Sequence, residues 1–281
     1  MLEPPFDIIE PSEGDSPVLV EIPHAGLAFD AESLEWTVAP GRCFARDADL
    51  YVDELFADAP ELGATLLCAR MSRYVVDLNR AETHHDAEAV AGSQRHTKHP
   101  RGVIWRLSSD NMPVLREPLS VSEYERRCAC YYRPYHDVIA RVLNRKRERF
   151  GLAVLLCAHS MPEPHRRSGA LPTVSPDLIP GTRGRTSAAT QWIDLVDEAG
   201  RARGWTVQHD VPYRGGFSTG HYGRPANNVH AVQIELARRL YMDEKSLARR
   251  SAGFAVVKDF ARDLVAKLVA EAKQVYCAPT S

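Results

Sequence analysis

The chain of 281 residues is 44% hydrophobic and 26% charged, which is typical of a folded globular protein and excludes a disordered or fibrous one. A net charge of −2 and a pI near 6.6 argue against nucleic-acid binding, because there is no excess of positive charge to meet phosphate groups. No stretch approaches the roughly 18 apolar residues of a membrane span. A chain of this length can bury about three quarters of its unfolded surface without a structural metal, so any metal site must be justified by chemistry.

The first residues and the cysteines indicate a reduced, cytoplasmic protein. The amino-terminal sequence MLEPPFDIIEP has neither the basic nor the apolar region of a secretory signal. Cys68 and Cys157 lie in apolar runs, where a free thiol behaves as a small hydrophobic group. Cys128 and Cys130 are too close together for a zinc knuckle, and no second pair accompanies them. We therefore expect structural, reduced cysteines and a cytoplasmic location.

Short apolar runs alternate with longer amphipathic stretches along the chain, which is the pattern of an α/β fold. Strands are predicted over residues 16–22, 63–69, 74–78, 102–107, 152–158, 205–209 and 231–236. Helices are predicted over residues 49–58, 122–150 and 188–203, with a helix pair within 243–272. The run LAVLLCA at 152–158 is the most apolar in the chain and predicts a central buried strand.

Residues 81–118 differ in composition from the rest, because they are rich in His, Ser, Pro, Gly and charged residues. We expect one domain over residues 1–281 in which this segment is an insertion or lid rather than core. As a lid, it would bring His84, Arg95 or His96 to a binding pocket.

Three polar residues stand at or near the carboxyl ends of predicted strands, where ligands bind in open α/β sheets. His24 follows LVEIP, His159 follows LLCA, and Glu235 interrupts QIEL. One such histidine is commonly a hydrogen-bonded core residue, but the three together are the residue types of a hydrolytic zinc site. Such a site uses about three protein ligands and keeps one position for water. We predict His24 and His159 as two ligands and Asp49 or Asp47 of RDADLYVDEL as the third, with Asp49 preferred.

Glu235 has a separate predicted role, that of general acid/base. A metal lowers the pKa of its water towards about 7, and a neighbouring carboxylate can take the proton and pass it to a leaving nitrogen. A buried salt bridge is the simpler explanation for Glu235, and capping of a helix amino-terminus is the simpler one for Asp47 and Asp49.

The segment SRYVVDLNR at residues 72–80 carries groups suited to an anionic substrate. Arg73, Asn79 and Arg80 bracket a predicted strand end, and arginine matches a carboxylate with two parallel hydrogen bonds. We expect one arginine to anchor a substrate carboxylate and the other to stabilise a developing oxyanion. Surface salt bridges are the alternative, more so for Arg73 than for Asn79 and Arg80.

The glycine-rich segment GGFSTGHYGRPANNVHAVQIE at residues 215–235 adds His221, Arg224 and His230 just before Glu235. Glycines permit close approach of the backbone to a ligand. The segment predicts the lip of a pocket, and a tight connection before the strand is the alternative.

Five motifs, in this order, resemble those of the N-formylglutamate amidohydrolase (deformylase) family: IPHAG (22–26), RDADLYVDEL (46–55), SRYVVDLNR (72–80), AHSMP (158–162) and HYGRPANNVHAVQIELARRLYMDE (221–244). They span about residues 15–245, and the last block is long and highly specific. The family is similar to zinc carboxypeptidases and aspartoacylase. The resemblance implies a three-layer α/β/α fold of the phosphorylase/hydrolase-like type, with a mixed, mostly parallel central sheet.

By position, the resemblance implies that His24 and His159 bind Zn²⁺ or another divalent metal, and that Glu235 is the general acid/base. The carboxypeptidase pattern places a glutamate ligand three residues after the first histidine, but Leu27 stands at that position here. This departure is the reason for assigning the third ligand to the RDADLYVDEL segment.

The same resemblance assigns the substrate-binding groups. Asn79 and Arg80 match the Asp-Leu-Asn-Arg motif with which aspartoacylase holds its substrate, and Arg73 falls near the oxyanion arginine of that family. Arg224 and His221 belong to the same predicted pocket. Family members often carry an arginine where Gly220 stands, and the segment after His159 also diverges, so the acyl group and the amino acid are left open.

The reaction implied is metal-dependent hydrolysis of N-formyl-L-glutamate to formate and L-glutamate, a late step of histidine breakdown in bacteria. The expected partner is therefore a small acidic N-acyl amino acid. Three alternatives remain: a zinc amidohydrolase or carboxypeptidase for another N-acyl amino acid or peptide, a serine hydrolase using Ser160, and a catalytically silent binding protein on the same fold. The absence of a G-x-S-x-G motif disfavours the serine hydrolase. Oligomeric state is not predicted.

Overall fold

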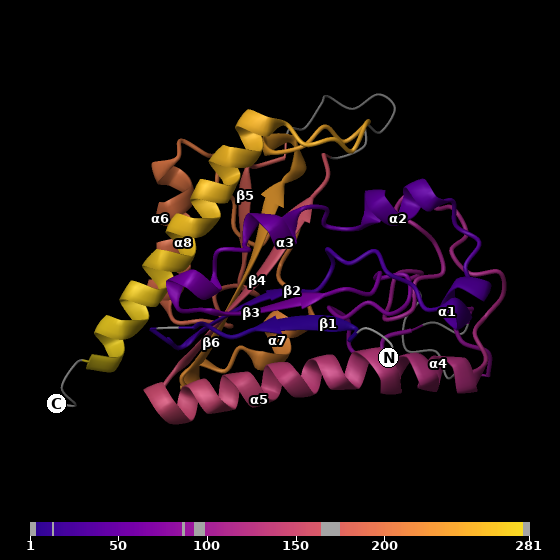
Figure 1. Ribbon diagram of the computed structural model, residues 1–281, viewed down its shortest axis with the longest axis horizontal. Helices are drawn as coiled ribbons and strands as arrows, with labels where there is room; N and C mark the ends of the chain where they lie inside the picture. Colours follow the sequence, from indigo (N-terminus) through magenta and orange to yellow (C-terminus); the bar gives the residue numbers. More distant parts are fainter. Residues whose placement is uncertain (1–3, 13, 86–87, 93–98, 164–174, 278–281) are drawn as a thin grey trace. The chain divides into compact units, whose positions relative to one another are not determined.

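The computed structural model describes residues 4–12, 14–85, 88–92, 99–163 and 175–277, and within them a six-stranded sheet has the order β1-β3-β2-β4-β6-β5 (Figure 1). Its strands are β1 (Phe6–Ile9), β2 (Val18–Ile22), β3 (Thr65–Ala69), β4 (Ala153–Met161), β5 (Leu178–Gly181) and β6 (Val229–Ala237). The α-helices are α1 (Ala31–Glu35), α2 (Gly41–Asp47), α3 (Val52–Leu55), α4 (Val121–Arg127), α5 (Arg133–Phe150), α6 (Thr190–Ala202), α7 (Phe217–Tyr222) and α8 (Ser251–Cys277). Short 3₁₀ turns cover Pro60–Leu62, Pro225–Asn227 and Arg238–Leu240.

The centre of the sheet is parallel. β4 lies between β2 and β6 and runs parallel to both, whereas β5 runs antiparallel to β6. All nine residues of β4 and all nine of β6 are buried, as expected for strands that are covered on both faces. The prediction of an α/β fold with a mixed, mostly parallel sheet is confirmed.

The chain forms two compact units, of residues 1–8, 22–50 and 67–142 and of residues 9–21, 51–66 and 143–281. The expectation of a single domain over residues 1–281 stays a prediction. None of the helices in the described part of the chain is both long enough and apolar enough to cross a membrane.

In the second unit, helices lie on both faces of the sheet. α7 covers one face, where Ser218 donates a hydrogen bond of 2.8 Å to Glu21 of β2 and the Thr219 hydroxyl lies 3.8 Å from the Cys157 sulfur of β4. Side chains alternate between faces along a strand, so His230 of β6 points to the opposite face from Gln233 and Glu235. α6 begins beside His230, which accepts a hydrogen bond from the Ala189 amide.

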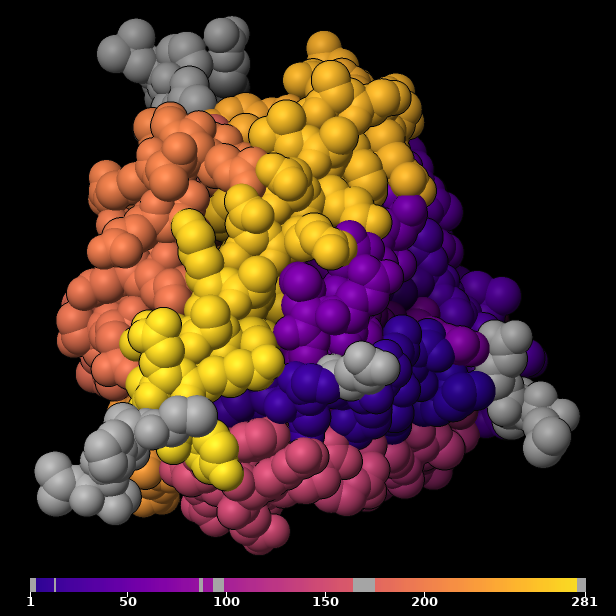
Figure 2. Space-filling view, turned by 60° about the vertical axis from the view of Figure 1, so that its left-hand side comes forward, coloured from indigo at the N-terminus to yellow at the C-terminus, as the bar shows by residue number. Residues whose placement is uncertain are grey.

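α8 lies on the surface of the second unit between α6 and the segment of residues 51–66 (Figure 2). Arg203, at the end of α6, pairs with Asp259 and Asp263 of α8. On the other side, Lys258 and Arg262 of α8 both pair with Asp58. One helix of 27 residues therefore stands where a helix pair was predicted over 243–272.

The predicted strands differ in outcome. Those at 16–22, 63–69, 152–158 and 231–236 correspond to β2, β3, β4 and β6, and the predicted helices at 122–150 and 188–203 to α4–α5 and α6. The prediction of a strand at 74–78 is wrong, because its backbone amides bond to loop atoms: the Val75 amide to the Ser72 carbonyl and the Asp77 amide to the Val103 carbonyl. Residues 102–107 and 205–209 contribute only isolated bridges, and the helix expected at 49–58 is reduced to α3.

The described part of residues 81–118 contributes to the core of the first unit, since Ala89, Val90, Val103 and Ile104 are all buried. A lid role for this segment remains a prediction. Arg95 and His96 lie outside the described residues. Cys43, Cys68, Cys128, Cys130 and Cys157 are free thiols.

Candidate active site

His24 lies two residues beyond β2 and is held between two aspartates. Its Nε2 lies 2.8 Å from Asp77 Oδ1, and its Nδ1 lies 3.7 Å from Asp49 Oδ2. The Asp49 amide also donates to the His24 carbonyl, which joins the two backbones at 2.9 Å. His24 and Asp49 are far apart in the sequence, but the turn after α2 brings Asp49 back to the end of β2.

Asp77 is a buried carboxylate surrounded by donors. Arg73 Nη2 lies 2.7 Å away, the Trp105 indole N–H 2.9 Å away and the Asn79 amide 2.9 Å away. Burial alone would raise the pKa of Asp77, but the positive charges of Arg73 and Arg80 and the hydrogen bond from His24 hold this pKa well below its usual range. An ionised carboxylate can only accept hydrogen bonds.

The charge of Asp77 decides which nitrogen of His24 carries the proton. Because Asp77 can only accept, His24 Nε2 must donate to it. In the neutral ring, the lone pair then resides on Nδ1, the nitrogen that faces Asp49. This is the arrangement in which a carboxylate orients a metal-binding histidine.

Asp47, the alternative third ligand, is engaged elsewhere. Its carboxylate accepts hydrogen bonds from the Tyr74 hydroxyl, the Ser109 hydroxyl and the Ser109 amide, the last at 2.9 Å. Burial and the neighbouring Asp47 charge raise the pKa of Tyr74, so that its hydroxyl stays protonated and donates. Asp47 thus holds a loop, whereas Asp49 approaches His24.

His159 and Glu235 are neighbours in the sheet. They are paired in the register of the parallel strands β4 and β6, so their side chains point to the same face. Both are buried. Glu235 Oε1 accepts a hydrogen bond of 2.9 Å from Gln233 Nε2, two residues earlier on the same strand and face.

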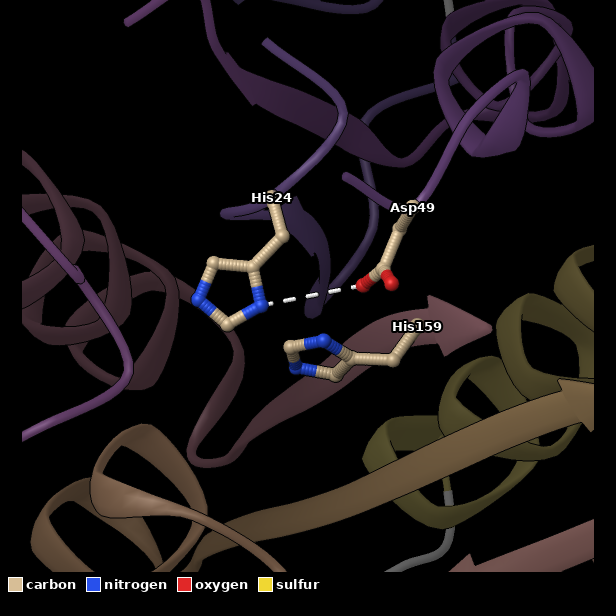
Figure 3. A group of neighbouring side chains, drawn as sticks. All are labelled: His24, Asp49 and His159. Carbon is tan, nitrogen blue, oxygen red and sulfur yellow. Dashed lines mark ion pairs between the residues drawn. The ribbon is translucent and has the colours of Figure 1, made fainter. Parts of the chain in front are cut away.

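His24, Asp49 and His159 form a buried group in which one ligand atom from each lies within 4.8 Å of the others (Figure 3). These are the ligands predicted from the sequence, where Asp49 was preferred to Asp47 as the third. Two imidazole nitrogens and one carboxylate oxygen fit a catalytic zinc ion, which takes three protein ligands and leaves a coordination position for water. The same donor set also suits other divalent metals that accept nitrogen and oxygen ligands.

The remaining residues of the 72–80 motif are held by backbone contacts. Arg80 Nε donates to the Arg101 carbonyl at 3.2 Å and Nη1 to the Asn79 carbonyl at 3.1 Å, while the Tyr132 hydroxyl donates to the Arg80 carbonyl at 2.8 Å. Arg73 also lies over the Trp105 ring, with 4.4 Å between the guanidinium carbon and the ring centroid. These contacts fix the planes of both guanidinium groups.

Arg224 and His221 lie at the end of α7. Arg224 Nη1 donates to the carbonyls of Gly220 and Gly223, at 2.7 and 2.9 Å. His221 stacks on Phe217, and burial together with the charge of Arg224 lowers its pKa, which favours a neutral ring.

Gly220 has a specific neighbour. A side-chain β-carbon at this position would lie 2.9–3.0 Å from the guanidinium end of Arg183, so this arginine occupies the space that a side chain at residue 220 would need. The departure at Gly220 noted in the sequence thus coincides with an arginine supplied from another segment.

The sequence motifs assign no role to two residues of this region, Asp77 and Gln233. Asp77 stands inside the quoted SRYVVDLNR motif, but its contact with His24 depends on a loop fold that the sequence does not reveal. Gln233 had a signal, because a spacing of two residues on a strand places it on the same face as Glu235.

Named proteins resemble this chain in sequence and in fold. The family model for N-formylglutamate amidohydrolase matches residues 16–242. Proteins named N-formylglutamate deformylase from Pseudomonas putida and Pseudomonas aeruginosa are 34% and 33% identical over 237 and 278 residues, covering 83% and 96% of this chain and 84% and 99% of theirs. A crystal structure of N-formylglutamate amidohydrolase from Ralstonia eutropha JMP134 superimposes with a TM-score of 0.87 at 29% identity, covering 96% of this chain and 99% of that one. The chain therefore belongs to the N-formylglutamate amidohydrolase family and is a hydrolase that acts on an amide bond.

Proposed function

We propose that this protein hydrolyses N-formyl-L-glutamate to formate and L-glutamate with a zinc ion held by His24, Asp49 and His159. The observation that carries the proposal is the buried group of these three side chains, with ligand atoms within 4.8 Å of one another, in a member of this family. When bound, zinc would lower the pKa of a water molecule and polarise the formyl carbonyl. A cytoplasmic location and a role in histidine breakdown are parts of the same proposal.

Glu235 is the proposed general acid/base. It lies beside His159 in the strand register, so its carboxylate is next to one of the three proposed ligands. In this role it accepts a proton from the attacking water and delivers it to the glutamate nitrogen as the C–N bond breaks. Balanced over the reaction, one water and one amide give one carboxylic acid and one amine.

Arg73 is the proposed oxyanion donor. Burial alone would lower the pKa of Arg73, but the charges of Asp77, Asp49 and Asp47 raise it, so the guanidinium stays charged. Its contacts with Asp77 and Trp105 fix that charge in place. A preorganised charge of this kind stabilises an oxyanion without reorganisation during the reaction.

The proposed substrate-binding residues are Asn79, Arg80, Arg224 and His221. The two arginines are oriented through backbone carbonyls, which leaves their charge available to the two carboxylates of a glutamate. N-acyl groups larger than formyl, or other amino acids, are the competing substrates within the same chemistry.

The test is formate release by the purified protein from N-formyl-L-glutamate, before and after a chelator, and again after zinc is restored. Activity that the chelator abolishes and zinc restores is the expected result. N-acetyl-L-glutamate and N-formyl-L-aspartate serve as comparison substrates, and a higher kcat/KM for either would reassign the acyl group or the amino acid. No hydrolysis of any of the three by the zinc-loaded protein would contradict the proposal.

Glu235→Gln separates the proton-transfer role from metal binding. We expect kcat to fall by about a hundredfold or more, since general acid/base groups contribute about 10²–10⁴-fold, while bound zinc is unchanged. Metal content measured on the same preparation is the control, and a variant with undiminished kcat would remove Glu235 from the mechanism.

A further inference from the structure

The side-chain amide of Gln233 joins Glu235 to the backbone that precedes α7. Its Nε2 donates to Glu235 Oε1 at 2.9 Å, and its Oε1 accepts from the Gly216 amide at 2.8 Å. Gln233 and Glu235 are both buried, so each hydrogen bond forms away from bulk water, where a misaligned polar group is costly.

The Gly216 amide determines which end of Gln233 faces Glu235. A backbone N–H can only donate, so the carbonyl end of Gln233 must face Gly216. The NH₂ end is then turned towards Glu235 and presents a donor to its carboxylate. A flipped amide would place its NH₂ group against the Gly216 N–H and its oxygen against the Glu235 carboxylate, so the network fixes this orientation.

The Gly216 amide is itself held by a rigid segment. Gly215 has a φ of +96°, a conformation that favours glycine, and a β-carbon there would lie 3.0 Å from the Thr219 methyl carbon. Two residues after Gly216, Ser218 bonds to Glu21 of β2 and so fixes α7 to the same sheet face. The amide of Gln233 is thus clamped between the sheet and the start of α7.

We propose that Gln233 is a positioning residue that fixes the orientation of the Glu235 carboxylate for proton transfer. The inference rests on the proposed role of Glu235. A donor on Oε1 sets the plane of the carboxylate, and proton transfer requires that plane to be aligned with the water and the leaving nitrogen.

The kinetic test uses two near-isosteric variants. Gln233→Met keeps the chain length but removes both hydrogen bonds, and Gln233→Glu keeps an acceptor for Gly216 but places a second carboxylate against Glu235. We expect kcat to fall about tenfold or more in both, because small misplacements of a catalytic group cost this much, while KM stays within about twofold. Ser187→Ala is the control, since it removes a buried hydrogen bond to Ala231 on the same strand and should keep kcat.

A double variant tells positioning from loss of structure. If Gln233 acts only through Glu235, adding Gln233→Met to Glu235→Gln causes no further loss of kcat. An equal additional loss in that background would overturn the proposal, as would a kcat for Gln233→Met within about twofold of the parent.

Crystal structures of the parent protein and of Gln233→Met provide a readout that does not depend on activity. A Glu235 carboxylate that rotates in the variant supports the proposal, and one that keeps its position overturns it. If the parent protein releases no formate, the proposed function fails, but this comparison still decides whether Gln233 orients Glu235.

Discussion

Among single residues, Asp77 sets the orientation of the His24 ring. It accepts from His24 Nε2, the charge of Arg73 keeps it ionised, and the hydrogen bonds from Arg73 and Trp105 hold it in place. The nitrogen that faces Asp49 is left with the lone pair as a result. The proposed metal ligands therefore depend on a residue that does not belong to their group.

Asp77→Asn is expected to weaken zinc binding by about 10–100-fold, the usual effect of changing a carboxylate that orients a ligand histidine. The neutral amide no longer enforces one tautomer of His24. Competition titration against a chromogenic chelator measures the affinity. Asp7→Asn, which breaks a half-exposed pair with Arg70, is the control and should leave the affinity unchanged. Equal affinities for Asp77→Asn and the parent protein would contradict this account.

Asparagine variants of Asp47 and Asp49 should have different effects, one on metal binding and the other on stability. Asp49→Asn is expected to lose bound zinc, whereas Asp47→Asn should keep it. Asp47→Asn should instead lower the free energy of unfolding by about 2 kcal/mol, because Tyr74 and Ser109 lose a charged acceptor. Metal content and urea denaturation of both variants provide the measurement, and loss of zinc from Asp47→Asn alone would reverse the assignment.

At this scale the sequence indicated some positions and left others undecided. His24, His159 and Glu235 were recognisable because a polar residue in or next to a buried strand costs free energy unless it has a partner. The choice between Asp47 and Asp49 depends on the turn after α2, where Ala48 leaves the helix with extended backbone angles and separates the two carboxylates. No spacing rule predicts that turn.

Among the elements, α4 begins with a clear capping signal. The Ser120 hydroxyl accepts a hydrogen bond of 3.1 Å from the Glu123 amide, and the sequence S-x-x-E is the capping-box pattern. Glu123 in turn pairs with Arg126 and with the buried Arg127. The start of the helix and this charge cluster are therefore coupled.

Ser120→Ala is expected to lower the free energy of unfolding by about 1 kcal/mol, the usual cost of losing an amino-terminal cap. Ser120→Asp keeps an acceptor for the Glu123 amide and should retain most of the stability. Urea denaturation of the parent protein and of both variants measures the effect. A Ser120→Ala variant as stable as the parent protein would show that the cap is dispensable.

Elements that bury apolar runs were predictable, and elements built around polar contacts were not. The run LAVLLCA became the fully buried β4, because only a covered strand accommodates such a sequence. The run YVVDL has similar composition, yet it forms a loop in which Tyr74, Val75 and Asp77 are buried by other segments. Apolar composition predicts burial in both cases, and strand pairing in only one.

For the whole molecule, the described charges are extensively paired, and this sets its response to acid. Burial alone would raise the pKa values of Glu10, Asp30 and Glu123, but hydrogen bonds to neighbouring side chains and nearby arginines lower them below their ordinary values. A carboxyl group with a lowered pKa in the folded state stabilises the fold above its unfolded pKa. That stabilisation is lost as the pH falls through the folded pKa.

The free energy of unfolding should therefore decrease as the pH falls below about 4.5, the ordinary value for a glutamate. Urea denaturation at a series of pH values between 7 and about 3 measures this dependence. Glu123→Gln removes one contributing group, so its stability should change less steeply with pH than that of the parent protein. Stability that is constant over this range would mean that these pairs contribute nothing.

The fold class was predictable from the alternation of apolar runs and amphipathic stretches, and the family was predictable from five ordered motifs. The division into two compact units was not, because each unit is assembled from three separate stretches of the chain. Such interleaving leaves no linker whose composition would mark a boundary.

The long helix that begins at Val121 contains one π-helical turn, Cys128–Tyr132, between α4 and α5. In a regular α-helix, residues five apart lie about 140° apart around the axis, but the wider turn brings Arg127 and Tyr132 towards a common side. Arg127 donates to the Val75 carbonyl at 3.1 Å and Tyr132 to the Arg80 carbonyl at 2.8 Å, so both brace the loop that carries Asp77. The helix therefore tolerates no deletion at this turn. A relative that lacks one of residues 128–132 could keep the Arg127 contact or the Tyr132 contact with the loop, but not both.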